Sequence, residues 1–108
     1  MTLTEFVTAR LDEEEAAMLA FIGREDLEKP AKRAGPRMLR EVTAKRAIVA
    51  SYSHAWERYQ DELEVDGSSK YDDGALAEWR EKWYALEPVG RFLAAIWSDH
   101  PDYDPTWA

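Results

Sequence analysis

A heptad of large apolar residues between positions 38 and 63 is the feature that most restricts how this chain can fold. The residues recur at alternating intervals of four and three, with Lys45 at the one polar position, and are Met38, Val42, Val49, Tyr52, Trp56, Tyr59 and Leu63. Such a seam lies along one side of a helix and is typical of helices that pack lengthwise against other helices. The pattern therefore predicts one long helix that needs a helical partner.

Helical periodicity predicts a further helix on either side of this one. The first opens with Thr2 and Glu5, spaced as a capping box, and ends near Gly23. Its apolar positions are Val7, Leu11, Met18, Phe21 and Ile22. The third begins after Asp72 or Asp73, either of which suits an N-cap, and its seam comprises Leu76, Trp79, Trp83, Leu86, Gly90, Leu93 and Trp97.

Proline and glycine mark the expected boundaries of these helices. Residues 24–36 predict a connection, although Pro36 also suits the first turn of a helix. A turn is expected at residues 65–70. Pro88 lies inside the third seam, where it removes a backbone hydrogen bond, and it predicts a kink or a break.

These elements predict an all-α fold with no strands. We expect a single helical domain over residues 1–108, built as an antiparallel three-helix bundle whose third helix is kinked or broken near Pro88. The C-terminal tail is expected to be irregular, with Tyr103 and Trp107 packing back on the bundle.

The neighbours of Lys45 can be predicted by folding the helices back on one another. An antiparallel hairpin of the first two helices brings Glu14 level with Lys45. Folding the third helix back about Gly67 brings Gly90 level with Lys45 as well. Two heptad seams also align when one is shifted by seven residues, so a slip of one heptad would change this register. We interpret Glu14, Lys45 and Gly90 as a structural charge layer that fixes the register of the helices. A charge pair in a functional site is the alternative interpretation.

Charge is spread unevenly along a chain whose formal net charge is −8. Bases dominate residues 29–46, and acids dominate residues 61–108. We expect the bases to pair mainly with the acidic run at residues 12–15. An alternative is a nucleic-acid patch, which we regard as the weaker hypothesis because the segment has no interleaved aromatics. Its residues would be Lys29, Lys32, Arg33, Arg37 and Arg40.

The sequence contains no cysteine and no recognisable catalytic motif. Disulfides, thiolate metal sites and cysteine nucleophiles are therefore excluded. His100 with Asp102, joined by Glu13 and Glu15, could form a metal or hydrolase site, but a histidine at a helix C-terminus is more simply a stop signal. We expect no enzymatic activity, no metal and no cofactor.

The N-terminal residues and the length of the apolar runs indicate where in the cell the protein is expected. The first residues lack the basic start and apolar stretch of a secretion signal, and no apolar run reaches the length of a membrane span. We therefore expect a cytoplasmic protein that does not enter a membrane.

Aromatic residues near acidic groups suggest a surface for a protein partner. The candidate residues are Tyr84, Asp99, His100, Asp102, Tyr103 and Trp107. We expect a non-enzymatic protein–protein interaction or regulatory module with an unknown protein partner. The heptad seams also allow a homodimer.

Three segments carry a resemblance to a known family: FVTARLDEEEAA at residues 6–17, RMLREVTAKRAIV at residues 37–49 and AIWSDHPDYDPTW at residues 95–107. In this order they resemble blocks of a family of small uncharacterised proteins from actinobacteria and their phages, a domain of unknown function. The resemblance implies a small helical cytoplasmic protein of bacterial or phage origin. It supplies no activity and no catalytic residue.

Overall fold

A computed structural model describes residues 1–24, 29–66 and 74–108, and for residues 29–32 and 65–66 it describes the backbone alone. The helices are α1 (Leu3–Ile22), α2 (Lys29–Asp66) and α3 (Ala75–Ala94), followed by the short 3-10 helices η1 (Ala95–Trp97) and η2 (Pro105–Trp107). The described parts of the chain contain no strand, so the predicted all-α class with three main helices is confirmed.

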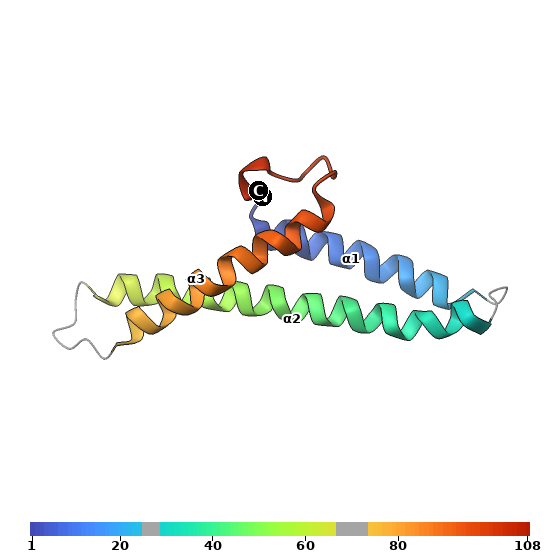
Figure 1. The fold of residues 1–108 in the computed structure, drawn as a ribbon, viewed down its shortest axis with the longest axis horizontal. Coiled ribbons are helices and arrows are strands. Elements are labelled where there is room, and N and C mark those ends of the chain that lie inside the picture. Colours follow the sequence, from blue (N-terminus) through green and yellow to red (C-terminus); the bar gives the residue numbers. More distant parts are fainter. Residues whose placement is uncertain (25–28, 67–73) are drawn as a thin grey trace.

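The 38 residues of α2 form the spine of the molecule. At 1.5 Å per residue this helix is about 57 Å long. α1 runs antiparallel along its N-terminal half, and α3 runs antiparallel along its C-terminal half (Figure 1). Because α1 and α3 overlap only near the middle of α2, the molecule is a rod of 66 × 27 × 17 Å with a two-helix arm at each end.

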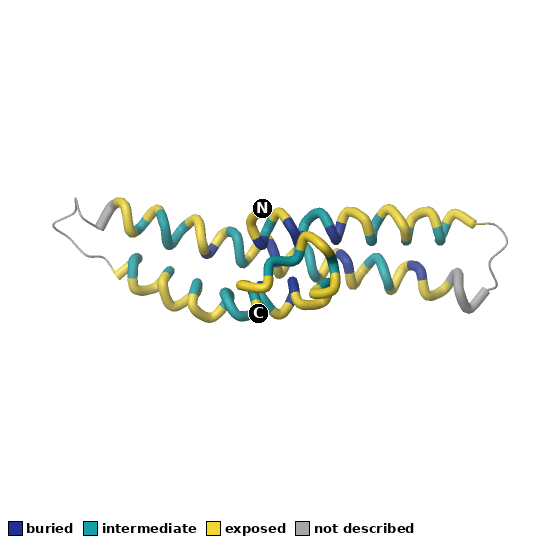
Figure 2. Tube along the Cα trace, turned by 90° about the horizontal axis from the view of Figure 1, so that it is seen from above, coloured by how far each residue is buried: buried dark blue, intermediate teal, exposed yellow. Residues whose placement is uncertain are grey.

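The core lies where the three helices and the tail meet. It comprises Leu3, Phe6, Val7 and Leu11 of α1, Val42 and Val49 of α2, and Leu93 and Ala94 of α3. Buried residues gather mainly around the middle of the rod, and exposed residues dominate its ends (Figure 2). Beyond this core, toward the C-terminal end of α2, the seam residues Trp56 and Leu63 remain 43% and 44% exposed.

The start of α2 corrects the expected connection. α2 begins at Lys29 and continues through Pro36, so most of residues 24–36 are helical, while residues 25–28 lie outside the described residues. Gly35 is buried beside Ile22, and a Cβ added to it would collide with that side chain. This glycine therefore allows close contact between α1 and α2 instead of ending a helix.

The start of α3 also differs from the prediction. Its N-cap is Gly74, whose φ of 81° is in the left-handed region that favours glycine. The predicted caps Asp72 and Asp73, together with residues 67–70 of the predicted turn, lie outside the described residues.

Pro88 does not break α3. The helix is continuous from Ala75 to Ala94, so of the two predicted alternatives, a kink or a break, the break is wrong. One missing backbone hydrogen bond is tolerated because α3 packs against Tyr52 of α2 on both sides of the proline, through Trp83 and Gly90.

Candidate functional site

The register of α1 against α2 brings the predicted charge pair together. Lys45 Nζ lies 3.8 Å from Glu14 Oε2, and both side chains are about one-quarter exposed, at 27% and 28%. The indole of Trp97 completes the arrangement, since its Nε1–H donates to Glu14 Oε1 over 3.2 Å and its ring lies 5.7 Å from Lys45 Nζ. The group therefore links α1, α2 and η1.

Gly90 is not part of this group. A Cβ added to Gly90 would collide with the ring of Tyr52, one heptad away from Lys45. Trp83 of α3 packs between two residues of the α2 seam, with ring centroids 4.7 Å from Trp56 and 4.9 Å from Tyr52. The register of α3 thus differs from the predicted one, as heptad repeats allow.

Replacing Lys45 with alanine is expected to lower the melting temperature more than replacing Arg46. Arg46 Nη2 pairs with Asp12 at 2.8 Å and with Glu15 at 2.5 Å, but these carboxylates are 63% and 42% exposed and stay hydrated without it. Glu14 Oε2 is buried, so removal of Lys45 leaves it without a countercharge. Thermal unfolding of the two variants tests this, and equal melting temperatures would contradict it.

Among the residues that the structure describes, Arg10 is the one charged residue that is buried, and its side chain is 7% exposed. Its Nη2 donates to Glu13 Oε1 over 3.0 Å, and its Nη1 contacts both ring nitrogens of His100, with Nδ1 at 2.8 Å. Asp102 Oδ2 lies 3.9 Å away. The backbone N–H of Asp102 also donates to His100 Nδ1 over 3.0 Å, so this nitrogen acts as an acceptor. Arg10 therefore ties the C-terminal tail to α1.

The predicted metal or hydrolase residues are arranged around this arginine. The guanidinium of Arg10 lies between Glu13, His100 and Asp102, where it would repel a cation. Within residues 1–24, 29–66 and 74–108, no three His, Asp or Glu side chains are grouped to hold a metal. Glu15 pairs with Arg46 instead.

The tail covers α1 with aromatic rings. Phe6 is 0% exposed, and its ring centroid lies 5.7 Å from that of His100, 6.0 Å from that of Tyr103 and 5.1 Å from that of Trp107. Asp104 caps η2 by accepting from the backbone N–H of Thr106 over 2.9 Å, and this hydrogen bond lowers the pKa of the Asp104 carboxyl. The expectation that Tyr103 and Trp107 pack back on the bundle is confirmed.

This packing reduces the predicted partner surface. His100, Tyr103 and Trp107 are half-buried and make contacts within the fold, so they do not form a free surface. Tyr84, Asp99 and Asp102 are exposed. Sequence reasoning missed Arg10, although Phe6 and Arg10 lie one helical turn apart beside the apolar face of α1.

The predicted basic patch lies at the N-terminal end of α2. Arg33, Arg37 and Arg40 are exposed and recur at intervals of four and three residues, which places them on one face of the helix. Arg37 Nε lies 3.7 Å from Glu41 Oε1, so part of this charge is compensated on α2 itself. The side chains of Lys29 and Lys32 lie outside the described part of the structure.

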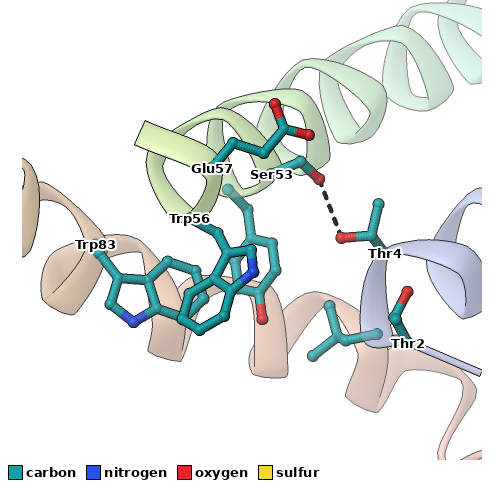
Figure 3. Close-up of a pocket in the computed structure, with 8 residues that line it drawn as sticks. Thr2, Thr4, Ser53, Trp56, Glu57 and Trp83 are labelled. Atoms are coloured by element: carbon teal, nitrogen blue, oxygen red, sulfur yellow. Dashed lines mark hydrogen bonds between the residues drawn. The ribbon is translucent and has the colours of Figure 1, made fainter. Parts of the chain in front are cut away.

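An open pocket of about 400 Å³ lies where the start of α1 meets α2 and α3. The indoles of Trp56 and Trp83 face it, and a hydrogen bond of 3.0 Å between Thr4 and Ser53 borders it (Figure 3). Burial raises the pKa of the Tyr52 phenol in its wall, and the negative charge of Glu87 acts in the same direction. The contacts around this pocket hold the N-terminus of α1 on the other two helices.

A second heptad, which we name the outer seam, runs along α3 and continues through η1 into the turn that follows. All six of its residues are exposed, and they are Lys82, Ala85, Val89, Phe92, Ile96 and Asp99. The exposed fractions of Val89, Phe92 and Ile96 are 37%, 73% and 52%. Sequence reasoning followed the larger residues of the inward seam and missed this one, although its three- and four-residue spacing is visible in the sequence.

These features define a small, rod-shaped, all-α protein in which a buried arginine and a charge pair join separated segments around one core. None of its described helices combines the length and apolar character needed to cross a membrane. Residues 1–108 match the family of unknown function DUF6221, and the chain belongs to this family. No curated protein and no solved structure matches the chain.

Proposed function

We propose that this protein, which its sequence resemblance suggests is of bacterial or phage origin, is a non-enzymatic protein–protein interaction module that binds through the outer seam. The observation that carries the proposal is the exposure of Val89 and Phe92 on α3 and of Ile96 on η1. An apolar stripe with helical spacing is the form in which one helix presents itself to another. Its energetic cost in water is offset when a partner covers it.

The rest of the molecule supports this choice of surface. The aromatic residues of the tail contact Phe6, and the charge pair of Glu14 and Lys45 lies between helices, so both groups serve the fold. The outer seam lies about 100° around α3 from the residues that contact α2, because each of its residues from Lys82 to Ile96 directly precedes a residue of the inward seam.

A photoreactive phenylalanine analogue at position 92 tests the proposal in cells that make the protein. We expect discrete cross-linked species of defined mass, because a partner helix would lie in contact with this side chain. The same analogue at position 19 is the matched control, since Leu19 is also exposed, at 53%, but lies on α1. Equal cross-linking at both positions, or none at position 92, would remove the proposal.

A further inference from the structure

The open pocket where the start of α1 meets α2 and α3 is lined by aromatic rings and one carboxylate (Figure 3). The rings are those of Tyr52 and Trp56 from α2 and Trp83 from α3, and the carboxylate is that of Glu57. No lysine, arginine or histidine of the described chain lines it. We propose that this pocket binds an alkylated ammonium group, which aromatic rings and a carboxylate attract together. None of the lining residues belongs to the outer seam, so the site does not depend on the proposed function.

The aromatic rings of the pocket lie against one another at an angle. The centroid of the Trp83 ring lies 4.7 Å from that of Trp56 and 4.9 Å from that of Tyr52, with interplanar angles of 52° and 59°. Trp56 is still 43% exposed, so part of its indole is accessible to a ligand. The negative face of an aromatic ring attracts a cation within about 6 Å of the centroid, and tryptophan does so most strongly. Rings tilted in this way suit a rounded cation such as a trimethylammonium group.

A neighbouring tryptophan shows that indoles in this fold attract cations. Lys82 Nζ lies 4.3 Å from the centroid of the Trp79 ring, and the guanidinium carbon of Arg58 lies 5.4 Å from it. In the part of the chain that the structure describes, no lysine or arginine lies over the ring of Trp56 or Trp83. The chain therefore supplies cations to Trp79, whereas a cation for the pocket would come from a ligand.

The charges around the pocket also favour a cation. Glu57 is exposed, and it makes no ion pair with any other described residue, so its carboxylate is accessible to a ligand. The N-terminus of α1 carries a partial positive charge, which the carboxylate of Glu5 in the first turn offsets. The net charge of −8 adds a longer-range attraction for cations.

Hydroxyl groups offer the ligand a second kind of contact. Thr2, Thr4 and Ser53 also line the pocket, and the hydroxyls of Thr4 and Ser53 share a hydrogen bond of 3.0 Å. A hydroxyl both donates and accepts, so each of these groups can bind a polar atom of the ligand as well. The volume of about 400 Å³ is within the range of small-molecule sites. These features fit a small molecule with a quaternary ammonium and a hydroxyl group, and choline is the simplest such probe.

Titration of the full chain with choline, followed by calorimetry and tryptophan fluorescence, tests the site. We expect a dissociation constant of about 1 mM or lower. The neutral isostere of choline, in which carbon replaces the ammonium nitrogen, is expected to bind at least about tenfold more weakly, because it keeps the shape and lacks the charge. A peptide with a trimethyllysine carries the same group on a protein. Tighter binding of choline assigns the site to a small molecule, and tighter binding of the peptide assigns it to a modified protein.

Three variants connect the binding to the pocket. Trp56→Leu keeps an apolar side chain without an aromatic face and is expected to weaken choline binding by roughly tenfold. Glu57→Gln removes the charge and is expected to weaken it by roughly fivefold. Glu64→Gln is the matched control, since Glu64 is exposed one heptad farther along α2 and does not line the pocket. This control should bind choline as the unchanged protein does.

Three results would each overturn the proposed site. They are no saturable binding of choline or the peptide up to about 10 mM, equal binding of the neutral isostere, and equal binding by Glu57→Gln and Glu64→Gln. Circular dichroism verifies that the helices of each variant are intact. Because Glu57 is exposed, its replacement keeps the test decisive even if Trp56→Leu does not fold.

Discussion

Replacing Phe6 with alanine is expected to lower the free energy of unfolding by about 3–5 kcal/mol, the usual cost of emptying a buried aromatic site. The ring is 0% exposed and lies between the core and the tail residues His100, Tyr103 and Trp107. Arg10 also loses a contact, since its guanidinium carbon lies 5.3 Å from the centroid of the Phe6 ring. The tail would therefore lose its apolar support and part of its polar anchor together.

Thermal and urea unfolding, followed by circular dichroism and tryptophan fluorescence, measure this loss. For a domain of this size, a loss of 3 kcal/mol or more corresponds to a fall in melting temperature of roughly 12 °C or more. Phe92→Ala is the matched control, because this phenylalanine is 73% exposed and its removal should cost no more than about 0.5 kcal/mol. Similar losses for the two variants, measured at dilute concentration, would contradict the described core.

The pairing of α1 with α2 could be predicted from the sequence because both helices carry a charged position within an apolar stripe. Matching Glu14 to Lys45 gives the register that the structure shows, with the two charged groups 3.8 Å apart. Opposite charges on two packed helices distinguish one register from its neighbours, since a slip would leave both without a partner. The all-α class followed from the same helical periodicity.

The placement of α3 could not be predicted in the same way. Its inward seam contains only apolar residues and Gly90, so registers that differ by one heptad bury similar surfaces. In the structure Gly90 lies beside Tyr52, and the position beside Lys45 is taken by Trp97. In the sequence, glycines such as Gly35 and Gly90 suggest places where a helix is destabilised. In the structure they allow close contacts between helices.

The contacts of the tail depend on how the whole chain folds, so they could not be predicted from the residues near it in the sequence. Arg10 and His100 are ninety positions apart, and their contact exists only because the ends of α1 and α3 meet at the middle of α2. The three segments at residues 6–17, 37–49 and 95–107 come together there through Glu14, Lys45 and Trp97. Their joint placement explains why residues far apart in the sequence serve one core.

Replacing Gly90 with alanine is expected to lower the free energy of unfolding by about 1–3 kcal/mol, even though alanine favours a helix by about 1 kcal/mol over glycine. The new Cβ would collide with the ring of Tyr52. That ring cannot turn aside freely, because it packs against Trp83 with centroids 4.9 Å apart. Gly23→Ala is the control, since a Cβ there would lie 3.4 Å or more from its neighbours and should have little effect.

A double-mutant cycle identifies the collision as the cause of this loss. In a Tyr52→Ala background the ring is absent, so the added Cβ of Gly90→Ala meets open space and its cost should disappear. The coupling energy between the two positions is then expected to be about 1–3 kcal/mol, as for residues in direct contact. Additive effects would mean that Gly90 does not lie against Tyr52, and the register of α3 on α2 would have to be reassigned.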